Sequence, residues 1–388
     1  MIARISILLL LMLLLSHLYV DRHFLRRRKG KWSRLVIAGP TAAMMIWTVV
    51  LVADHDFVPK DMAMMNIFFF LIGLIFVPKA TFALCSSVGY LFRKLVHSRY
   101  NWGNLAGFFC AIIVLSIHLY GSLVGPRELK VRRVDISVAD LPVSFDGYRI
   151  VLFSDAHVGT FTGRLRSVLQ RDVDSINAQQ PDAIMFAGDL QNVEPSELYP
   201  VQDMLRSLHA KDGIFSVLGN HDYSYYSHGD PAVKAANERE LVSRERQFGW
   251  TLLRNEHVGI QRNGETLVIA GEEYWEPYSG KTKADLGKTL DGIPDNACVI
   301  LLQHNPSAWR SHILPNSDVQ LTLCGHTHGG QLSLFGVRAS RIRHREDHGL
   351  YREGNRHLYV TCGIGGVVPF RFGVSPEIAV ITLHTKHQ

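Results

Sequence analysis

The sequence predicts an α/β layered domain that follows an all-α transmembrane region, and two observations lead to this fold class. Up to about Gly125, Leu, Ile, Phe, Met and Val dominate, whereas the later residues mix charge, glycine and apolar residues as a soluble domain does. From about Val131, short apolar runs alternate with amphipathic or loop segments, which is typical of layered α/β domains. We therefore expect a transmembrane region of about four helices over residues 1–125 and a second domain over residues 126–388.

The first region contains four apolar stretches, each close to the roughly 20 residues that a helix needs to cross a bilayer core. They are Ile5–Val20, Leu35–Val52, Met64–Phe76 with its continuation Ala80–Phe92, and Leu105–Val124. The first follows Arg4 as a signal peptide would, but a basic cluster rather than a cleavage site comes after it. An uncleaved anchor is therefore expected.

The loops between these stretches alternate in charge, which predicts an orientation. The first loop is basic, with Arg22, Arg26, Arg27, Arg28, Lys29, Lys31 and Arg34. The second loop is acidic, with Asp54, Asp56 and Asp61 against Lys60, and the third is again basic, with Arg93, Lys94 and Arg99. Basic loops stay in the cytoplasm, so four crossings place the second domain on the outer side. Arg127, Lys130, Arg132 and Arg133 act against this orientation, and a count that differs by one helix would invert it.

The net charge of +6 does not by itself indicate a nucleic-acid partner, and none is expected. Much of the excess lies in the basic cluster after the first stretch, where it serves membrane orientation. Within the stretches His118 is the main ionisable residue and no polar pair suggests an ion path, so an anchor is favoured over a transporter. The five cysteines have no CxxC spacing and are expected to be small buried residues rather than disulfides.

The second region contains apolar runs of the length of buried strands. They are Tyr148–Phe153, Ala183–Phe186, Ile214–Leu218, Val299–Leu302, Val319–Leu323, Leu358–Val360 and Ile378–Leu383. Two helical stretches, Arg164–Ala178 and Ala232–Phe248, separate the early runs. The region contains neither an internal repeat nor a low-complexity tract.

Polar residues follow the first five of these strands in a regular way. The segments are SDAH, GDLQN, GNHD, QHN and GHTH, in that order. Open α/β sheets bind ligands at the carboxyl ends of their strands, so the five segments can converge on one site. Each alone could be an ordinary turn, but together they deliver Asp, Asn and His, which are metal-ligand types.

The motifs Asp155-Ala-His157, Gly188-Asp189, Gly219-Asn220-His221-Asp222, His304 and Gly325-His326-Thr-His328 follow one another in the order of a known pattern. The sequence thus resembles the calcineurin-like metallophosphoesterase superfamily over most of residues 150 to 330. The phrases FDGYRIVLFSDAHVG and GHTHGGQ resemble its membrane-associated bacterial branch. The resemblance implies a four-layer sandwich, two packed sheets flanked by helices, in a protein of the bacterial inner membrane.

The resemblance also implies a role for each residue. Asp155, His157 and His328 would bind one metal ion, Asn220, His304 and His326 a second, and Asp189 would bridge both. Asn192 departs from the family's GDxxD pattern; that position is not usually a ligand, so the departure concerns support of the centre.

A centre of this kind suits an anionic phosphodiester, which repels hydroxide. Two cations about 3.5–4 Å apart neutralise its oxygens and help to supply the nucleophile. The carboxylates offset metal charge, and the imidazoles favour Mn, Fe or Zn over Mg alone. The lack of thiolate ligands argues against a structural zinc site.

Three further groups of residues are candidates for the substrate side. His221 is expected to face the substrate and to protonate the leaving alkoxide, with Asp222 holding its tautomer and raising its pKa. A basic stretch after GHTHGGQ is either a solvated loop or a binding site for phosphate or a lipid head group, with Arg341 and Arg343 as candidates; it comprises Arg338, Arg341, Arg343, His344 and Arg345. Tyr223, Tyr225 and Tyr226 either line the pocket or form a tyrosine-rich turn.

These features predict a dinuclear metal-dependent phosphoester hydrolase, with a phosphodiesterase favoured, that acts at the membrane surface. The anchor makes lipid-linked or nucleotide-sugar-lipid phosphoesters attractive substrates, although anchors also serve enzymes with soluble substrates. The alternative is a catalytically weak membrane sensor or binding module with the same fold. The sequence leaves the natural substrate, the native metal and the oligomeric state open.

Overall fold

The structure is a computed structural model, and it describes residues 2–26, 30–53, 62–227, 229–276 and 282–386. Several residues on which the predicted orientation rests lie outside this part, namely Arg27, Arg28, Lys29, Asp54, Asp56, Lys60 and Asp61. The chain forms two compact units, one of residues 1–59 with 63–123 and one of residues 60–62 with 124–388.

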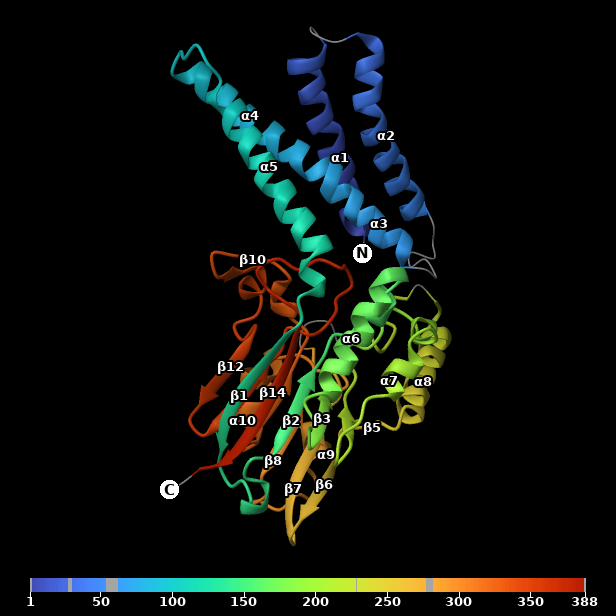
Figure 1. The fold of residues 1–388 in the computed structure, drawn as a ribbon, viewed down its shortest axis with the longest axis vertical. Coiled ribbons are helices and arrows are strands. Elements are labelled where there is room, and N and C mark those ends of the chain that lie inside the picture. Colours follow the sequence, from blue (N-terminus) through green and yellow to red (C-terminus); the bar gives the residue numbers. More distant parts are fainter. Residues whose placement is uncertain (1, 27–29, 54–61, 228, 277–281, 387–388) are drawn as a thin grey trace. The chain divides into compact units, whose positions relative to one another are not determined.

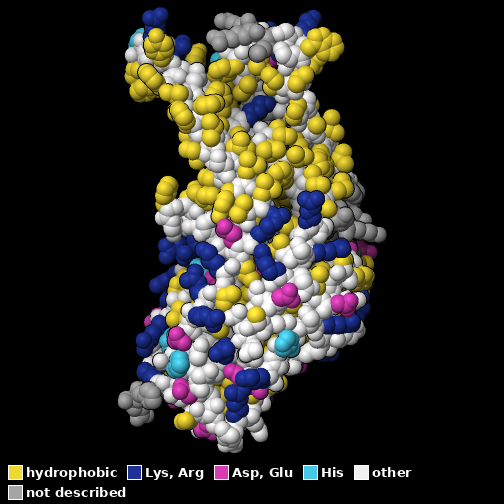
Figure 2. Space-filling view, viewed as in Figure 1, with side chains coloured by type: hydrophobic (Ala, Val, Ile, Leu, Met, Phe, Trp, Pro, Cys, Tyr) yellow, Lys and Arg dark blue, Asp and Glu magenta, His cyan; other side chains and the backbone are white. Residues whose placement is uncertain are grey.

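The first unit is helical (Figure 1). Its helices are α1 (Ile2–Val20), α2 (Lys31–Ala53), α3 (Ala63–Leu71), α4 (Val77–Leu95) and α5 (Trp102–Leu123). A π-helical turn over Ile72–Phe76 joins α3 to α4, so residues 63–95 form one run. Four runs among the described residues are long and apolar enough to cross a membrane. Figure 2 shows hydrophobic side chains over much of this unit on the face in view, as a lipid environment requires.

One polar cluster links three of the membrane helices. Lys79 Nζ lies 2.8 Å from His17 Nδ1 and donates to Thr41 Oγ1 at 2.8 Å, which links α4 to α1 and α2. In the sequence, Pro78 and Lys79 interrupt the apolar run between Phe76 and Ala80. The helix instead continues, because proline is tolerated in the first turn of α4, and Lys79 is therefore placed among other helices.

The second unit contains two six-stranded sheets and a short hairpin. The first sheet has the order β1-β14-β2-β3-β4-β5, with only β14 and β2 antiparallel, and consists of β1 (Lys130–Val138), β2 (Arg149–Phe153), β3 (Ala183–Phe186), β4 (Ile214–Ser216), β5 (Thr251–Leu252) and β14 (Glu377–Thr385). The second sheet has the order β12-β13-β9-β8-β7-β6, antiparallel at both edges, and consists of β6 (Glu256–Arg262), β7 (Glu265–Gly271), β8 (Val299–Leu302), β9 (Leu321–Cys324), β12 (Gly349–Glu353) and β13 (Arg356–Val360). The hairpin pairs β10 (Ser333–Leu334) with β11 (Val337–Arg338).

The two sheets pack face to face, with helices on their outer faces. Successive residues of a strand point to opposite faces, so Ile150 and Leu152 of β2 lie in the core between the sheets with Ile300 and Leu302 of β8. Val151 packs instead toward the helices. The helices of this unit are α6 (Arg166–Asn177), α7 (Gln202–Arg206), α8 (Pro231–Gln247), α9 (Leu286–Leu290) and α10 (Leu314–Asn316). The four-layer α/β sandwich predicted from the sequence is confirmed.

The predicted elements correspond to β2, β3, β4, β8, β9, β13, β14, α6 and α8, with small differences at the ends. Those that the sequence analysis missed are mostly peripheral strands, namely β1, β5, β6, β7, β10, β11 and β12. Most lie at sheet edges or in the hairpin, where one face is exposed and the apolar run is interrupted by charge, as in β1 (KVRRVDISV).

Candidate metal centre

The predicted ligands all follow the carboxyl ends of parallel strands. Asp155 and His157 follow β2, Asp189 follows β3, and Asn220 comes soon after β4. On the second sheet His304 follows β8, and His326 and His328 follow β9. Because the sheets pack with these ends together, side chains from both sheets meet at one edge of the sandwich.

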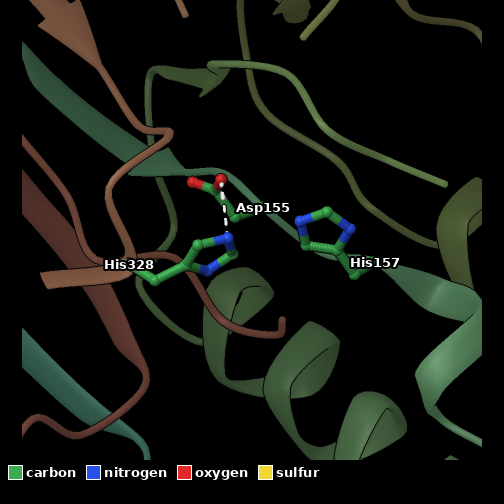
Figure 3. Close-up of side chains that lie close together, drawn as sticks. All are labelled: Asp155, His157 and His328. Carbon is green, nitrogen blue, oxygen red and sulfur yellow. Dashed lines mark ion pairs between the residues drawn. The ribbon is translucent and has the colours of Figure 1, made fainter. Parts of the chain in front are cut away.

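One group consists of Asp155, His157 and His328, whose candidate ligand atoms lie within 4.8 Å of one another. His328 Nε2 is 3.5 Å from Asp155 Oδ1, and Figure 3 marks this pair with a dashed line. The carboxylate of Asp155 also accepts the backbone N–H of His326 at about 3.0 Å and the hydroxyl of Ser154. These contacts attach the end of β2 to the loop after β9.

A second group consists of Asp189, His304 and His326, again within 4.8 Å. Asp189 Oδ2 lies 3.2 Å from His304 Nε2 and 3.6 Å from His157 Nε2 of the first group. Asp189 therefore lies between the two groups, where a bridging ligand would have to be.

Buried atoms without partners test whether metal ions fit these groups. Among the described residues, both ring nitrogens of His157, Nδ1 of His328 and Oδ1 of Asn220 are buried and have no hydrogen-bond partner. Leaving such atoms buried and unpaired costs free energy, roughly 1–3 kcal/mol each. A set of imidazole, carboxylate and amide atoms with vacant lone pairs fits divalent cations.

The backbone of the site is strained. Five of the seven predicted ligands have a positive φ; they are Asp155 (50°), His157 (45°), Asp189 (61°), His326 (73°) and His328 (51°). Such a backbone conformation costs roughly 1–3 kcal/mol for a residue other than glycine, and it persists where the surroundings impose it. Because five such residues lie in these loops, the positions of the ligand side chains determine the backbone conformation of the loops.

The glycines of the motifs allow the loops to pack this closely. A Cβ at Gly325 would lie 2.5 Å from Asp155 Oδ2, and one at Gly219 would lie 2.1 Å from Asp189 Oδ1. Real Cβ atoms do not approach other heavy atoms so closely. The ligand carboxylates therefore occupy the space that any side chain at these positions would need.

Charge pairs shift the titration of the buried groups. Burial raises the pKa of Asp189, but His304, His221 and His157 lower it well below its usual value. Burial lowers the pKa of His304, and Asp189 reverses this to raise it to about 9. Burial is the main cause that lowers the pKa of His157 and of His328 to about 3. The last two imidazoles are therefore neutral at pH 7, as metal ligands must be.

His221 lies beside the first group, but Asp222 does not hold its ring. The expectation that Asp222 sets the His221 tautomer is wrong, because His221 Nδ1 contacts the backbone carbonyl of Asn192 at 2.6 Å. A carbonyl only accepts hydrogen bonds, so Nδ1 carries the proton and Nε2 is left for other partners. The His221 ring also stacks on Tyr226, with centroids 4.3 Å apart.

Asp222 binds backbone instead. Its carboxylate accepts N–H groups from Asp189, Leu190 and Gly219 at 2.8–2.9 Å and from Gln191 at 3.3 Å. Burial, together with the charge of Asp189, raises the pKa of Asp222 to about 7. Its role is to join the loops after β3 and β4.

Asn192, the departure from the family pattern, supports this arrangement. Its carbonyl holds His221, while its side chain donates to Thr160 Oγ1 at 3.0 Å. Of the three tyrosines, Tyr226 borders the site through His221 and accepts from Asn220 Nδ2 at 3.0 Å. Tyr223 is buried and donates to Glu273.

The basic stretch after GHTHGGQ divides into two parts. Arg338 forms a two-pronged pair with Asp347 at 2.6 and 2.8 Å, and Arg341 is exposed 3.8 Å from the same carboxylate. The charge of Arg343 acts on His344: burial lowers the pKa of His344, and Arg343 lowers it further. The His344 ring packs against His326, with centroids 5.4 Å apart, and the sequence analysis did not single it out as a site residue.

Another cluster of potential ligands is held by protein groups. His348, Cys362 and Glu377 offer atoms within 4.8 Å of one another. The Glu377 carboxylate, however, already contacts Arg132, Tyr359 and His348 at 2.8–3.1 Å. These contacts fill its acceptor positions, so the cluster is a buried network rather than a metal site.

Comparison with known proteins assigns the class of this chain. Residues 148–330 match the family model for calcineurin-like phosphoesterases, and residues 3–126 match the model described as "Probable Calcineurin-like phosphoesterase, transmembrane domain". The chain belongs to the calcineurin-like metallophosphoesterases, as the sequence motifs predicted, and its described residues include four helical runs long and apolar enough to cross a membrane. This family binds two divalent metal ions.

Several relatives support the assignment. The chain is 32% identical over 281 residues to a transmembrane protein with metallophosphoesterase domain of Danio rerio, covering 70% of this chain but only 61% of that protein. It is 31% identical over 279 residues to the uncharacterized metallophosphoesterase YkuE of Bacillus subtilis, covering 69% of this chain and 90% of that protein. An uncharacterized metallophosphoesterase of Helicobacter pylori is 30% identical, and the match covers 73% of this chain and 70% of that protein.

We predict that Gly325→Ala lowers the metal content of the purified chain. The added Cβ must displace Asp155 or Ser154, and displaced ligands bind metal more weakly. Elemental analysis after dialysis measures the ratio of metal to protein. Gly287→Ala is the matched control, because its nearest neighbour would lie at an ordinary 3.6 Å; equal metal content in both variants would contradict the packing argument.

Proposed function

We propose that the chain is a dinuclear phosphodiesterase, in which Asp155, His157 and His328 hold one metal ion, Asn220, His304 and His326 hold the second, and Asp189 bridges them. The observation that carries this proposal is Asp189, which lies 3.2 Å from His304 and 3.6 Å from His157, between two groups with unpaired buried ligand atoms. The bound ions would neutralise phosphate oxygens and lower the pKa of a water molecule. Mn, Fe and Zn fit the imidazole-rich set.

His221 supplies the proton for the leaving group in this proposal. Its Nδ1 proton is held by the Asn192 carbonyl, which orients the ring. When the bond between phosphorus and the leaving oxygen breaks, the Nε2 proton of the imidazolium passes to the alkoxide. Asp222 acts only by positioning the loops after β3 and β4. Arg343, and to a lesser extent Arg341, would bind the negative charge of the substrate.

A lipid-linked phosphoester is the substrate class that we propose, and an apolar groove beside the centre supports it. The groove is lined mainly by Phe161, Leu165, Val368, Pro369 and Phe370. Gly366 also lines it, and a Cβ there would lie 3.6 Å from His328 Nδ1, so the groove adjoins the first group of ligands. The groove is small, so it would contact only the part of an acyl or prenyl chain nearest the phosphate.

We further propose that the protein lies in a bacterial cell membrane, with the catalytic domain on the outer side. The alternation of basic and acidic loops supports the orientation, and the Bacillus and Helicobacter relatives support a bacterial source.

The central prediction concerns metal and activity together. The purified chain should hold about two metal ions and should hydrolyse an aryl phosphodiester when loaded with Mn. His304→Ala should remove one ion and lower turnover by more than the roughly 10–100-fold that loss of a supporting residue costs. The control is His209→Ala, at an exposed histidine. This variant should keep both the metal content and the turnover. A fully loaded chain without hydrolysis would favour the sensor alternative.

A second variant separates metal binding from proton transfer. His221→Ala should keep both metal ions but lower turnover by roughly 10²–10⁴-fold, because a general acid contributes about that much. Elemental analysis and the aryl phosphodiester assay give the two values. Loss of a metal ion would instead make His221 a ligand, since it also lies within 4.8 Å of His157 and Asp189.

Membrane orientation can be tested with two matched cysteine variants. Val143→Cys lies in the catalytic domain and Val96→Cys in the loop after α4, and both valines are exposed. In intact cells an impermeant thiol reagent should label the first and not the second, until the cells are permeabilised. The reverse pattern would place the catalytic domain in the cytoplasm.

A further inference from the structure

The hairpin β10–β11 exposes an apolar tip that the metal centre does not use. Phe335 is fully exposed, with a relative exposure of 105%, and Ile342 is 92% exposed in the turn that follows the hairpin. Leu334 and Val337 are exposed beside them. Figure 1 shows the segment around β10 at one end of the catalytic domain, beyond the strands of the sheets.

The conformation of Phe335 makes its exposure more unusual. Leu334 and Val337 pair across a two-residue turn in which Phe335 and Gly336 both have positive φ, 51° and 80°. Turns of this kind favour Asn, Asp or Gly at both central positions. A large apolar side chain at this position strains the backbone and exposes apolar surface to water. These two costs indicate that the Phe335 side chain becomes buried in another environment.

Basic side chains surround this tip. Arg341 and Arg345 are 59% and 76% exposed, and Arg343 is exposed between them. An apolar tip flanked by arginines is the pattern of segments that enter the interface of an anionic bilayer, with apolar groups below the head groups and cations among them. A protein partner would not require this cationic rim.

The base of the hairpin is held firmly to the loop that carries two predicted ligands. Arg338 and Ser340 both bind the buried carboxylate of Asp347, and the Asp347 carbonyl accepts from Thr327, which stands between His326 and His328. Gln331, which precedes the hairpin, donates to the carbonyls of Val368 and Phe370 in the apolar groove. Hydrogen bonds thus connect the base of the hairpin to both the groove and the ligand loop.

The chain also keeps this domain close to a bilayer. The span α5 ends at Leu123 and β1 begins at Lys130. A connection of this length reaches at most about 25 Å. A lipid surface is therefore always within reach of the catalytic domain.

We propose that the hairpin tip, formed by Leu334, Phe335, Val337 and Ile342, inserts into the interface of an anionic lipid bilayer, with Arg341, Arg343 and Arg345 among the phosphate groups. Insertion would bring the apolar groove next to the lipid surface. This inference goes beyond the proposed function, because contact with lipid does not depend on turnover.

The test uses the full chain reconstituted into vesicles, with a polarity-sensitive fluorophore on Phe335→Cys or, separately, on Ile342→Cys. Val143→Cys is the matched control, since Val143 is another exposed apolar residue of the same domain. Wild-type protein taken through the same labelling gives the background from the native cysteines. Vesicles contain phosphatidylcholine alone or mixed with phosphatidylglycerol, with and without nitroxide-labelled lipid.

In vesicles with phosphatidylglycerol we expect a blue shift and quenching by nitroxide lipid at positions 335 and 342, but neither at 143. Both effects should weaken with phosphatidylcholine alone, because the arginines then lose their anionic partners. Equal emission and quenching at all three positions would overturn the proposal, and equal insertion into both kinds of vesicle would overturn the role of the arginines. The measurement is made without metal or substrate, so failure of the proposed hydrolase activity would leave its result unchanged.

Discussion

The position of the loops at the centre depends on one buried carboxylate, Asp222, that binds backbone. By accepting N–H groups from Gly219 and from the loop 189–191, it joins the ends of β4 and β3. The backbone of Asp189 is held at positive φ, and its side chain accepts the N–H of His221 at 2.8 Å. The position of Asp189 between the two groups of candidate ligands and the approach of His221 therefore both depend on the backbone contacts of Asp222.

Contacts between the two sheets complete the centre. His304, from the second sheet, contacts the carbonyl of Ala187 at the end of β3 at 2.7 Å, and the N–H of His326 binds Asp155. The glycines of the motifs permit these close approaches, because the ligand carboxylates occupy the space that a Cβ at those positions would need. The assembled loops bury imidazole nitrogens without partners, so metal binding and the packing of these loops stabilise each other.

The membrane part has a polar feature of its own. A lysine within an apolar helix is unfavourable unless other groups solvate it, and Lys79 finds His17 and Thr41 on neighbouring helices. This arrangement links three helices of the first unit. Ser86 of α4 likewise contacts Tyr19 of α1 at 2.8 Å and donates to Asn104 of α5 at 2.6 Å, so polar contacts join the helices of this unit at more than one place.

The sequence by itself determined the division into membrane and α/β regions, the family and the set of candidate ligands. Hydrophobic patterning is local, and the motifs carry their order and residue types wherever the chain folds. The tertiary structure alone decided that Asn192 rather than Asp222 orients His221, that Lys79 has partners, and that Phe335 stands exposed at a hairpin tip. Those features depend on which loops meet and on which side chains are left without cover, and neither can be read from spacing along the chain.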